Sequence, residues 1–182
     1  MNAETVVRAQ RGEQQAFALI AGELAEPFLA VARRILRDLD LAEDAAQQGL
    51  LDAWRFLPQL RDPARFEAWA YRLLVRACYA EARRERRRAP NLRSLPLDGP
   101  PAADAYGPVV DREQLDVAFR RLTFDHRTIV VLHLYLDQPL DRAAEILGIP
   151  VGTAHSRLHH AMRALRAALE ADARTPLREV VG

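Results

Sequence analysis

The sequence contains no lysine and only one cysteine among its 182 residues. A lone Cys78 excludes an internal disulfide, a CxxC redox site and a thiolate zinc cluster, and we expect it to be a small buried residue on a helix. No stretch approaches the roughly 18 to 20 apolar residues that a membrane helix needs, and no signal-peptide pattern opens the chain. These absences predict a cytoplasmic protein that does not insert into a membrane.

Three further features are missing, namely a useful run of alternating strand residues, a glycine-rich phosphate loop and internal repeats. Apolar residues nevertheless make up 49% of the chain, which is enough for one or two small cores. Their spacing is helical wherever they form a regular pattern. The sequence therefore predicts an all-α protein.

Positive charge is concentrated in one short segment. Residues 71–93 carry a net charge of about +6, whereas the segments on either side are slightly negative. The exclusive use of arginine is best explained by a GC-rich genome, although its planar fork of donors also suits phosphates and base edges. A nucleic-acid contact is one interpretation of this segment, and a solvated charge run partly balanced by Glu81 and Glu85 is the other.

The first half of the chain predicts a helical domain. Apolar residues recur every three or four positions over 17–35, where Pro27 implies a kink or two separate helices. A second apolar stripe covers 50–57 and stops at Pro58. A third helix begins near Pro63 and continues into the arginine run that ends at residue 88.

The middle of the chain reads as a linker because five prolines and two glycines stand between residues 89 and 110. Apolar stripes over 115–122 and 129–136 then indicate two more helices. The expected organisation is a first domain over 1–88, a linker over 89–110, a second domain over 111–173 and a frayed tail over 174–182.

Residues 140–169 have the pattern of a helix-turn-helix unit. A short apolar helix precedes Gly148, which can adopt the left-handed backbone that a tight turn between helices needs. The next helix begins near Val151, with Thr153 as a possible cap. Its outer face is polar and can enter a major groove, and it carries Ser156, His159, His160, Arg163 and Arg166. An ordinary amphipathic helix with a solvated face is the alternative reading.

At this point the residues resemble a known family. The stretch AAEILGIPVGTAHSRLHHAMRALRAAL is similar to region four of extracytoplasmic-function sigma factors of the bacterial sigma-70 family. Three earlier stretches, RGEQQAFALI, LAEDAAQQGLLDAWRFL and FEAWAYRLLVRACYAEARRERRR, are similar to the parts of region two, in the same order. The resemblance implies two helical domains, one binding core RNA polymerase and minus-10 DNA and the other minus-35 DNA.

The resemblance also implies roles for particular residues. Polymerase docking falls on Asp44, Gln47, Gln48, Asp52 and Trp54. Minus-10 recognition and strand opening fall on Phe66, Trp69, Tyr71, Arg72, Arg76, Arg83 and Arg84. Minus-35 recognition falls on Thr153, His155, Ser156, Arg157, His159, His160 and Arg163. The implied partners are core RNA polymerase, promoter DNA and an anti-sigma factor that would cover these surfaces.

Some positions depart from the family pattern. Val75, Arg76 and Ala80 stand where the family often has an Arg-Asn pair followed by Asp, so we expect a different minus-10 preference. Gln48 and Gly49 replace a common acidic residue and threonine. Because glycine inside a helix costs about 1 kcal/mol relative to alanine, we expect that helix to be bent or locally loose.

The histidines of the last helix allow a second reading. His155 and His159 are four residues apart, a spacing that can hold a metal, but no third ligand accompanies them, so we expect no metal and no cofactor. His155 and His160 replace basic residues that are frequent in the family, which predicts modest or pH-sensitive promoter affinity.

Three other functions compete with this one. An enzyme is disfavoured because Ser156 lies near histidines on an open helix without an orienting acid or an oxyanion site. A stand-alone helix-turn-helix regulator would not need the polymerase-docking segment. A sigma-like interaction module without promoter-opening activity remains the alternative to a promoter-directing initiation factor.

Overall fold

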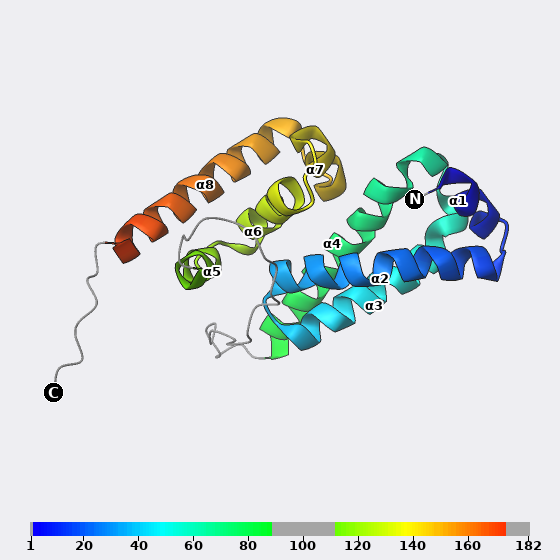
Figure 1. Cartoon of the computed structure of the whole chain (residues 1–182), viewed down its shortest axis with the longest axis horizontal. Helices are drawn as coiled ribbons and strands as arrows, with labels where there is room; N and C mark the ends of the chain where they lie inside the picture. Colours follow the sequence, from blue (N-terminus) through cyan, green and yellow to red (C-terminus); the bar gives the residue numbers. More distant parts are fainter. Residues whose placement is uncertain (1, 89–111, 174–182) are drawn as a thin grey trace.

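The computed structural model describes residues 2–88 and 112–173, and its regular elements in this part of the chain are helical (Figure 1). The all-α prediction is confirmed. The N-terminal group comprises α1 (Ala3–Gln10), α2 (Gln14–Leu36), α3 (Leu39–Phe56), the 3-10 turns η1 (Leu57–Gln59) and η2 (Pro63–Arg65), and α4 (Phe66–Arg88). The C-terminal group comprises α5 (Arg112–Arg120), α6 (Phe124–Val130), the π-helical turn η3 (Val131–Tyr135), α7 (Leu140–Leu147) and α8 (Val151–Ala173).

The predicted linker over 89–110 and tail over 174–182 lie outside the described residues, so the domain boundaries stay predictions. In Figure 1 the helices α5–α8 form a group of their own beside the bundle of α2, α3 and α4. The N-terminal core lies where α3 packs between α2 and α4, and α1 covers one end of α2. The C-terminal core lies where α5, α6 and α7 pack on α8.

Helix α2 runs unbroken through Pro27, so of the two expected alternatives, a kink or two separate helices, the second is excluded. Pro27 is exposed, and a proline inside a helix removes one backbone hydrogen bond. The apolar stripe nevertheless keeps one helical phase on both sides of it, from Ile20 to Ile35, and all of that stripe is buried. Burial of the stripe against α3 and α4 outweighs the lost bond.

Helix α2 also corrects the expectation about long apolar stretches. Among the described residues it is a helix long and apolar enough, by length and composition, to cross a membrane, with a mean hydropathy of 1.3. Its most apolar residues face α3 and α4, whereas Glu23 and Glu26 are exposed on the other side. A core helix of a folded domain can meet the same criteria of length and composition. We therefore interpret α2 as such a core helix.

At Gly49, helix α3 lies close to both α2 and α4. A Cβ atom there would lie 3.2 Å from Phe28 Cε2 and 3.3 Å from Leu74 Cα. Gly49 is buried and α3 is continuous around it, so the helix is not interrupted at this glycine. The absence of a side chain is used for packing, because a larger residue would push α3 away from α2 and α4.

The two helical glycines of this bundle predict opposite responses to valine. Gly49→Val should lower the free energy of unfolding by about 1 to 3 kcal/mol through overpacking. Gly22→Val is the matched control, because nothing lies within 4 Å of its missing Cβ, and it should be neutral or slightly stabilising. Urea unfolding followed by circular dichroism measures both. Equal stabilities of the two variants would contradict the close packing at Gly49.

The turn of the helix-turn-helix unit follows the prediction. Gly148 caps α7 in the left-handed conformation with φ 67°, and its N–H donates to the Glu145 carbonyl at 3.1 Å. Ala144 and Ala154 are buried where α7 meets α8. Thr153 is not the cap, because α8 already begins at Val151 and the Thr153 N–H bonds a carbonyl of the preceding turn.

The helix expected over 129–136 is divided. Helix α6 ends at Val130 and the chain continues as a π-helical turn, in which the Leu136 N–H donates to the Val131 carbonyl at 3.0 Å. This wider turn leaves Leu134 exposed, although Ile129 is fully buried. The sequence pattern does not reveal the π-helical turn, because a turn of 5 residues is too short to show its wider period.

Candidate functional site

The residues assigned to polymerase docking share the outer side of α3. Asp44, Gln47 and Gln48 are exposed, and Gln48 Nε2 donates to Asp52 Oδ1 at 2.9 Å. Trp54 is 44% exposed, so it is not a core residue. Its indole packs against the ring of Phe17 in a T-shaped arrangement, with the ring centroids 4.6 Å apart, and this contact leaves part of the indole open to solvent.

Leu51 is a candidate that the sequence pattern did not reveal. It is 55% exposed, one turn after Gln47 and one turn before Arg55. Exposed apolar side chains inside a polar rim are typical of a protein interface, and Leu51 and Trp54 provide them beside Asp44 and Gln48. Its position in the sequence could have predicted this exposure, since Leu51 lies outside the buried stripe of α3.

The aromatic residues at the start of α4 are mostly core. Phe66 is 2% exposed and Tyr71 is 6% exposed, and the Tyr71 ring lies 5.5 Å from that of Phe28. Burial raises the pKa of Tyr71 to about 12. Trp69 is half-buried, 5.8 Å from the Phe66 ring. In this conformation Phe66 and Tyr71 offer no face to an unpaired base, and Trp69 offers part of one.

The basic residues of α4 divide into two groups. Arg76 and Arg83 are exposed, as is Arg84, which pairs with Glu81 at 3.5 Å. Arg72 is half-buried and its Nη2 donates to the Glu145 carbonyl of α7 at 2.5 Å. The exposed arginines continue to the end of the helix over 86–88, so most of this positive charge faces solvent.

The three residues of α4 that depart from the family pattern differ in their exposure to solvent. Val75 is buried, 3% exposed, whereas Arg76 and Ala80 are exposed. Cys78 is fully buried as expected, and its burial raises the thiol pKa to about 12. Only Arg76 and Ala80 are therefore available to alter what this face of α4 contacts.

The residues assigned to minus-35 recognition all lie on α8, and all but one of them are on its exposed side. The helix buries Ala154 and Ala161 against the other helices of its group. Arg157 is the exception, because it is half-buried and its Nη2 pairs with Asp125 Oδ2 of α6 at 2.8 Å. The exposed side carries Thr153, His155, Ser156, His159, His160 and Arg163.

A shallow hollow of about 410 Å³ adjoins this exposed side. It is lined by His126 of α6 together with His160 and Arg163 of α8. The His126 and His160 rings are stacked, with their centroids 6.3 Å apart. Imidazole and guanidinium groups can donate to a phosphate, so His126 joins the candidate DNA surface. Sequence spacing could not reveal it, because only the packing of α6 on α8 brings it there.

Comparison with known proteins shows the family to which these helices are similar. The family model for Sigma-70 region 2 matches residues 23–88, and the model for Sigma-70, region 4 matches residues 112–165. The first match spans α3 and α4, which carry the candidate polymerase and minus-10 residues. The second spans the helix-turn-helix unit and most of α8.

Relatives along the chain agree with these matches. The ECF RNA polymerase sigma factor SigL of Mycobacterium tuberculosis is 33% identical over 143 residues, covering 76% of this chain and 80% of SigL. The RNA polymerase sigma-H factor of Pseudomonas aeruginosa is 26% identical over 179 residues, covering 92% of this chain and 93% of sigma-H. The ECF RNA polymerase sigma factor SigW of Bacillus subtilis is 26% identical over 173 residues, covering 88% and 92%.

Solved structures share the fold. CnrH in complex with the cytosolic domain of CnrY superposes with a TM-score of 0.66 at 22% identity, covering 93% of this chain and 97% of that one. RpoE from Bartonella quintana in complex with the anti-sigma factor NepR superposes with a TM-score of 0.68 at 24% identity, covering 87% of this chain and 97% of that one. With two matched family regions and a relative at 33% identity, this chain belongs to the sigma-70 family, among the sigma factors of extracytoplasmic-function type.

Proposed function

We propose that this chain, by family a non-enzymatic transcription initiation factor that directs RNA polymerase to promoters, acts through three of its surfaces. The outer side of α3 binds core polymerase, the exposed arginines of α4 contact DNA near the minus-10 element, and the exposed side of α8 reads the minus-35 element. The cytoplasm, which holds core polymerase and the chromosome in bacteria, is the location that this function requires.

The single observation that carries the DNA-reading proposal is the two-sided character of α8. Ala154 and Ala161 are fully buried, while the opposite side presents Ser156, His159 and Arg163 to solvent. A recognition helix must expose hydrogen-bonding side chains that reach base edges in a major groove. The turn at Gly148 holds α7 across the start of α8, as this type of DNA-binding unit requires.

The polymerase-docking proposal rests on α3. Exposed Leu51 and Trp54 would supply apolar contact, with Asp44, Gln47 and Gln48 beside them as the polar part of the interface. The structures of CnrH and of Bartonella RpoE are complexes with a protein partner. By analogy, we propose an anti-sigma partner for this chain that covers one or more of the three surfaces.

Transcription with purified core polymerase tests the proposal. The chain, core polymerase and a pool of promoter fragments from the source genome should together give transcripts with defined start sites that neither protein gives alone. If the chain binds core polymerase but starts no transcript, the interaction module without promoter-opening activity becomes the better reading. If it binds DNA but no polymerase, a stand-alone regulator does.

A single substitution then tests the reading role of α8. Arg163→Gln should reduce transcription from a responsive promoter by about tenfold, because one good base or phosphate contact is worth roughly 1 to 3 kcal/mol. Arg11→Gln is the control, since it removes the same charge from an exposed residue of the N-terminal domain. Equal activities of the two variants would remove Arg163 from the DNA surface.

A further inference from the structure

The hollow between α6 and α8 has a basic lining. His126 lines it from α6, and His160 and Arg163 line it from α8, with Ala164 and Ala167 beside them. The described residues of this lining include no carboxylate. Imidazolium and guanidinium groups donate hydrogen bonds and accept none. A hollow of about 410 Å³ with such a lining fits an anion.

The carboxylate that precedes His126 in the sequence, Asp125, already has partners for both of its oxygens. Tyr79 Oη donates to Asp125 Oδ1 at 2.5 Å, and Arg157 Nη2 pairs with Asp125 Oδ2 at 2.8 Å. The Asp125–Arg157 pair is neutral as a unit, so it does little to offset the positive charge of Arg163. The positive charge at the hollow therefore remains available to a ligand.

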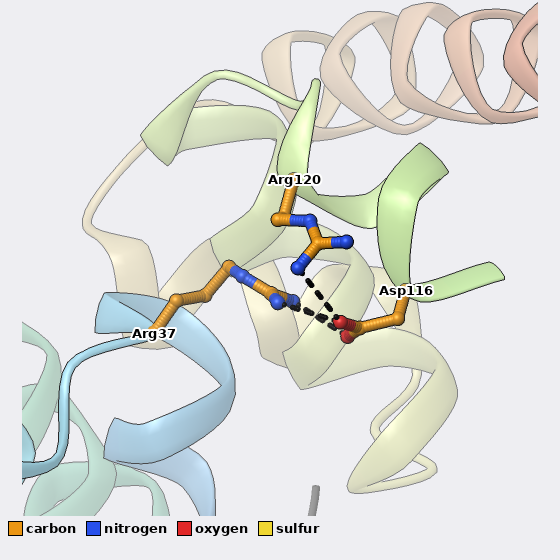
Figure 2. Close-up of polar contacts among 3 residues, drawn as sticks. All are labelled: Arg37, Asp116 and Arg120. Carbon is orange, nitrogen blue, oxygen red and sulfur yellow. Dashed lines mark hydrogen bonds and ion pairs between the residues drawn. The ribbon is translucent and has the colours of Figure 1, made fainter. Parts of the chain in front are cut away.

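Elsewhere in the chain, converging arginines have an anionic partner. Figure 2 shows Arg37 and Arg120 converging on Asp116. Arg37 donates to both carboxylate oxygens at 3.0 Å, and Arg120 lies 3.5 Å from one of them. Among the described residues, no carboxylate pairs with the three donors that line the hollow. An anion for the hollow therefore has to come from outside the described part of the chain.

The two imidazoles at the hollow are spaced for one phosphate group. The ring centroids of His126 and His160 are 6.3 Å apart, and the ring planes are 23° from parallel. A charge-assisted N–H···O bond is about 2.7 to 2.9 Å long, so two such bonds that meet at one phosphate match this spacing. Arg163 adds a planar fork of donors, which suits the oxygens of a phosphate.

The hollow lies beside the candidate base-reading residues of α8. One of these residues, His159, packs its ring edge-on against that of His160, with the centroids 5.6 Å apart. In helix-turn-helix proteins the recognition helix enters the major groove while another helix crosses the DNA backbone. Contacts to phosphates fix the register of the protein on the duplex. A phosphate in the hollow would therefore set the register of α8 in the groove.

We propose that the hollow is a phosphate site, in which His126, His160 and Arg163 hold one phosphate of the DNA backbone beside the groove that α8 reads. The inference rests on the proposed DNA-reading role of α8, and it adds a contact from outside the recognition helix, since His126 belongs to α6. A phosphate carries no base identity, so this contact adds affinity at every promoter and does not select the sequence.

Promoter binding by the polymerase complex tests the role of His126. His126→Gln should weaken binding about tenfold, the effect of losing one hydrogen bond to a charged group, and by the same factor on every promoter. The slope of log affinity against log salt should fall by up to about 0.9, the contribution of one phosphate. His126→Arg keeps donors and charge and should bind like the parent. His133→Gln is the matched control, because His133 lies outside the lining and its Nδ1 is hydrogen-bonded to the Gln138 carbonyl.

A methylphosphonate scan of a duplex bound by the full chain identifies the phosphate itself. Each charged phosphate in turn is replaced by a neutral methylphosphonate. At one position the parent should lose affinity, whereas His126→Gln should lose nothing beyond its own effect, which is the signature of a direct contact. Inorganic phosphate is the second probe, followed through the imidazole NMR signals of the free chain. If inorganic phosphate shifts the His126 and His160 signals but no position of the duplex is coupled to His126, the hollow serves a free anion and the proposal is overturned.

The outcomes separate this site from the proposed function. Coupling at one phosphate without transcription would keep the site and remove the initiation role. Intact transcription without coupling at any phosphate would overturn the site alone. The same conclusion would follow if His126→Gln changed the preference between promoters instead of weakening all of them equally. A chain that binds no duplex overturns both.

Discussion

Phe28→Ala should lower the free energy of unfolding of the N-terminal domain by about 3 to 5 kcal/mol. Phe28 is fully buried, its ring lies 5.5 Å from that of Tyr71, and it fills the space that Gly49 leaves open. Removing the ring takes away that apolar burial and leaves a cavity between α2, α3 and α4. Because small domains have only about 5 to 15 kcal/mol of stability in total, much of this domain's stability should be lost.

Urea unfolding followed by circular dichroism measures the loss. Leu19→Ala is the control on the same helix, because Leu19 is 59% exposed and its truncation should change stability by less than about 0.5 kcal/mol. A loss below about 1 kcal/mol for Phe28→Ala would mean that the bundle collapses into the vacated space, which would contradict tight packing at Gly49.

Replacing Arg86, Arg87 and Arg88 together by glutamine should weaken promoter binding by the polymerase complex by about two to three orders of magnitude near 0.1 M salt. The three side chains are exposed at the end of α4. If each contacts one phosphate, the slope of log affinity against log salt should fall by about 2.7, because each contact contributes roughly 0.9. Titrations of a labelled promoter at several salt concentrations give both quantities.

The corresponding triple replacement by lysine is the control. Lysine keeps the positive charge but not the planar fork of arginine, so the salt slope should stay close to that of the parent. A glutamine variant with an unchanged slope would show that this arginine run is a solvated surface, as the alternative reading of the sequence holds.

Several local features were predictable because they depend on residues close in the chain. Gly148 stands where a tight turn needs a positive φ, and the structure has φ 67° there. The alternation of small apolar and polar residues in α8 predicted which side is buried, from Ala154 to Ala168. Thr153 was wrongly predicted as the cap of α8, because the helix already begins at Val151 and capping depends on where the preceding turn ends.

Other features depended on which helices pack together. The aromatic pattern of α4 could not separate Phe66 and Tyr71, which are core, from Trp69, which is half-exposed. Trp54 continued an apolar stripe in sequence, yet it lies at the margin of α3 against Phe17 and is 44% exposed. In both cases the neighbouring helix, not the residue type, decides the exposure.

The sequence by itself determined the helical class, the helix-turn-helix unit and the polar face of α8, because periodicity and backbone preferences act over a few residues. The tertiary structure decided the use of individual side chains. Only packing between distant segments brings Arg37 to Asp116, Tyr79 to Asp125 and His126 to the side of α8. Such contacts form when folded surfaces meet, so no pattern within one helix encodes them.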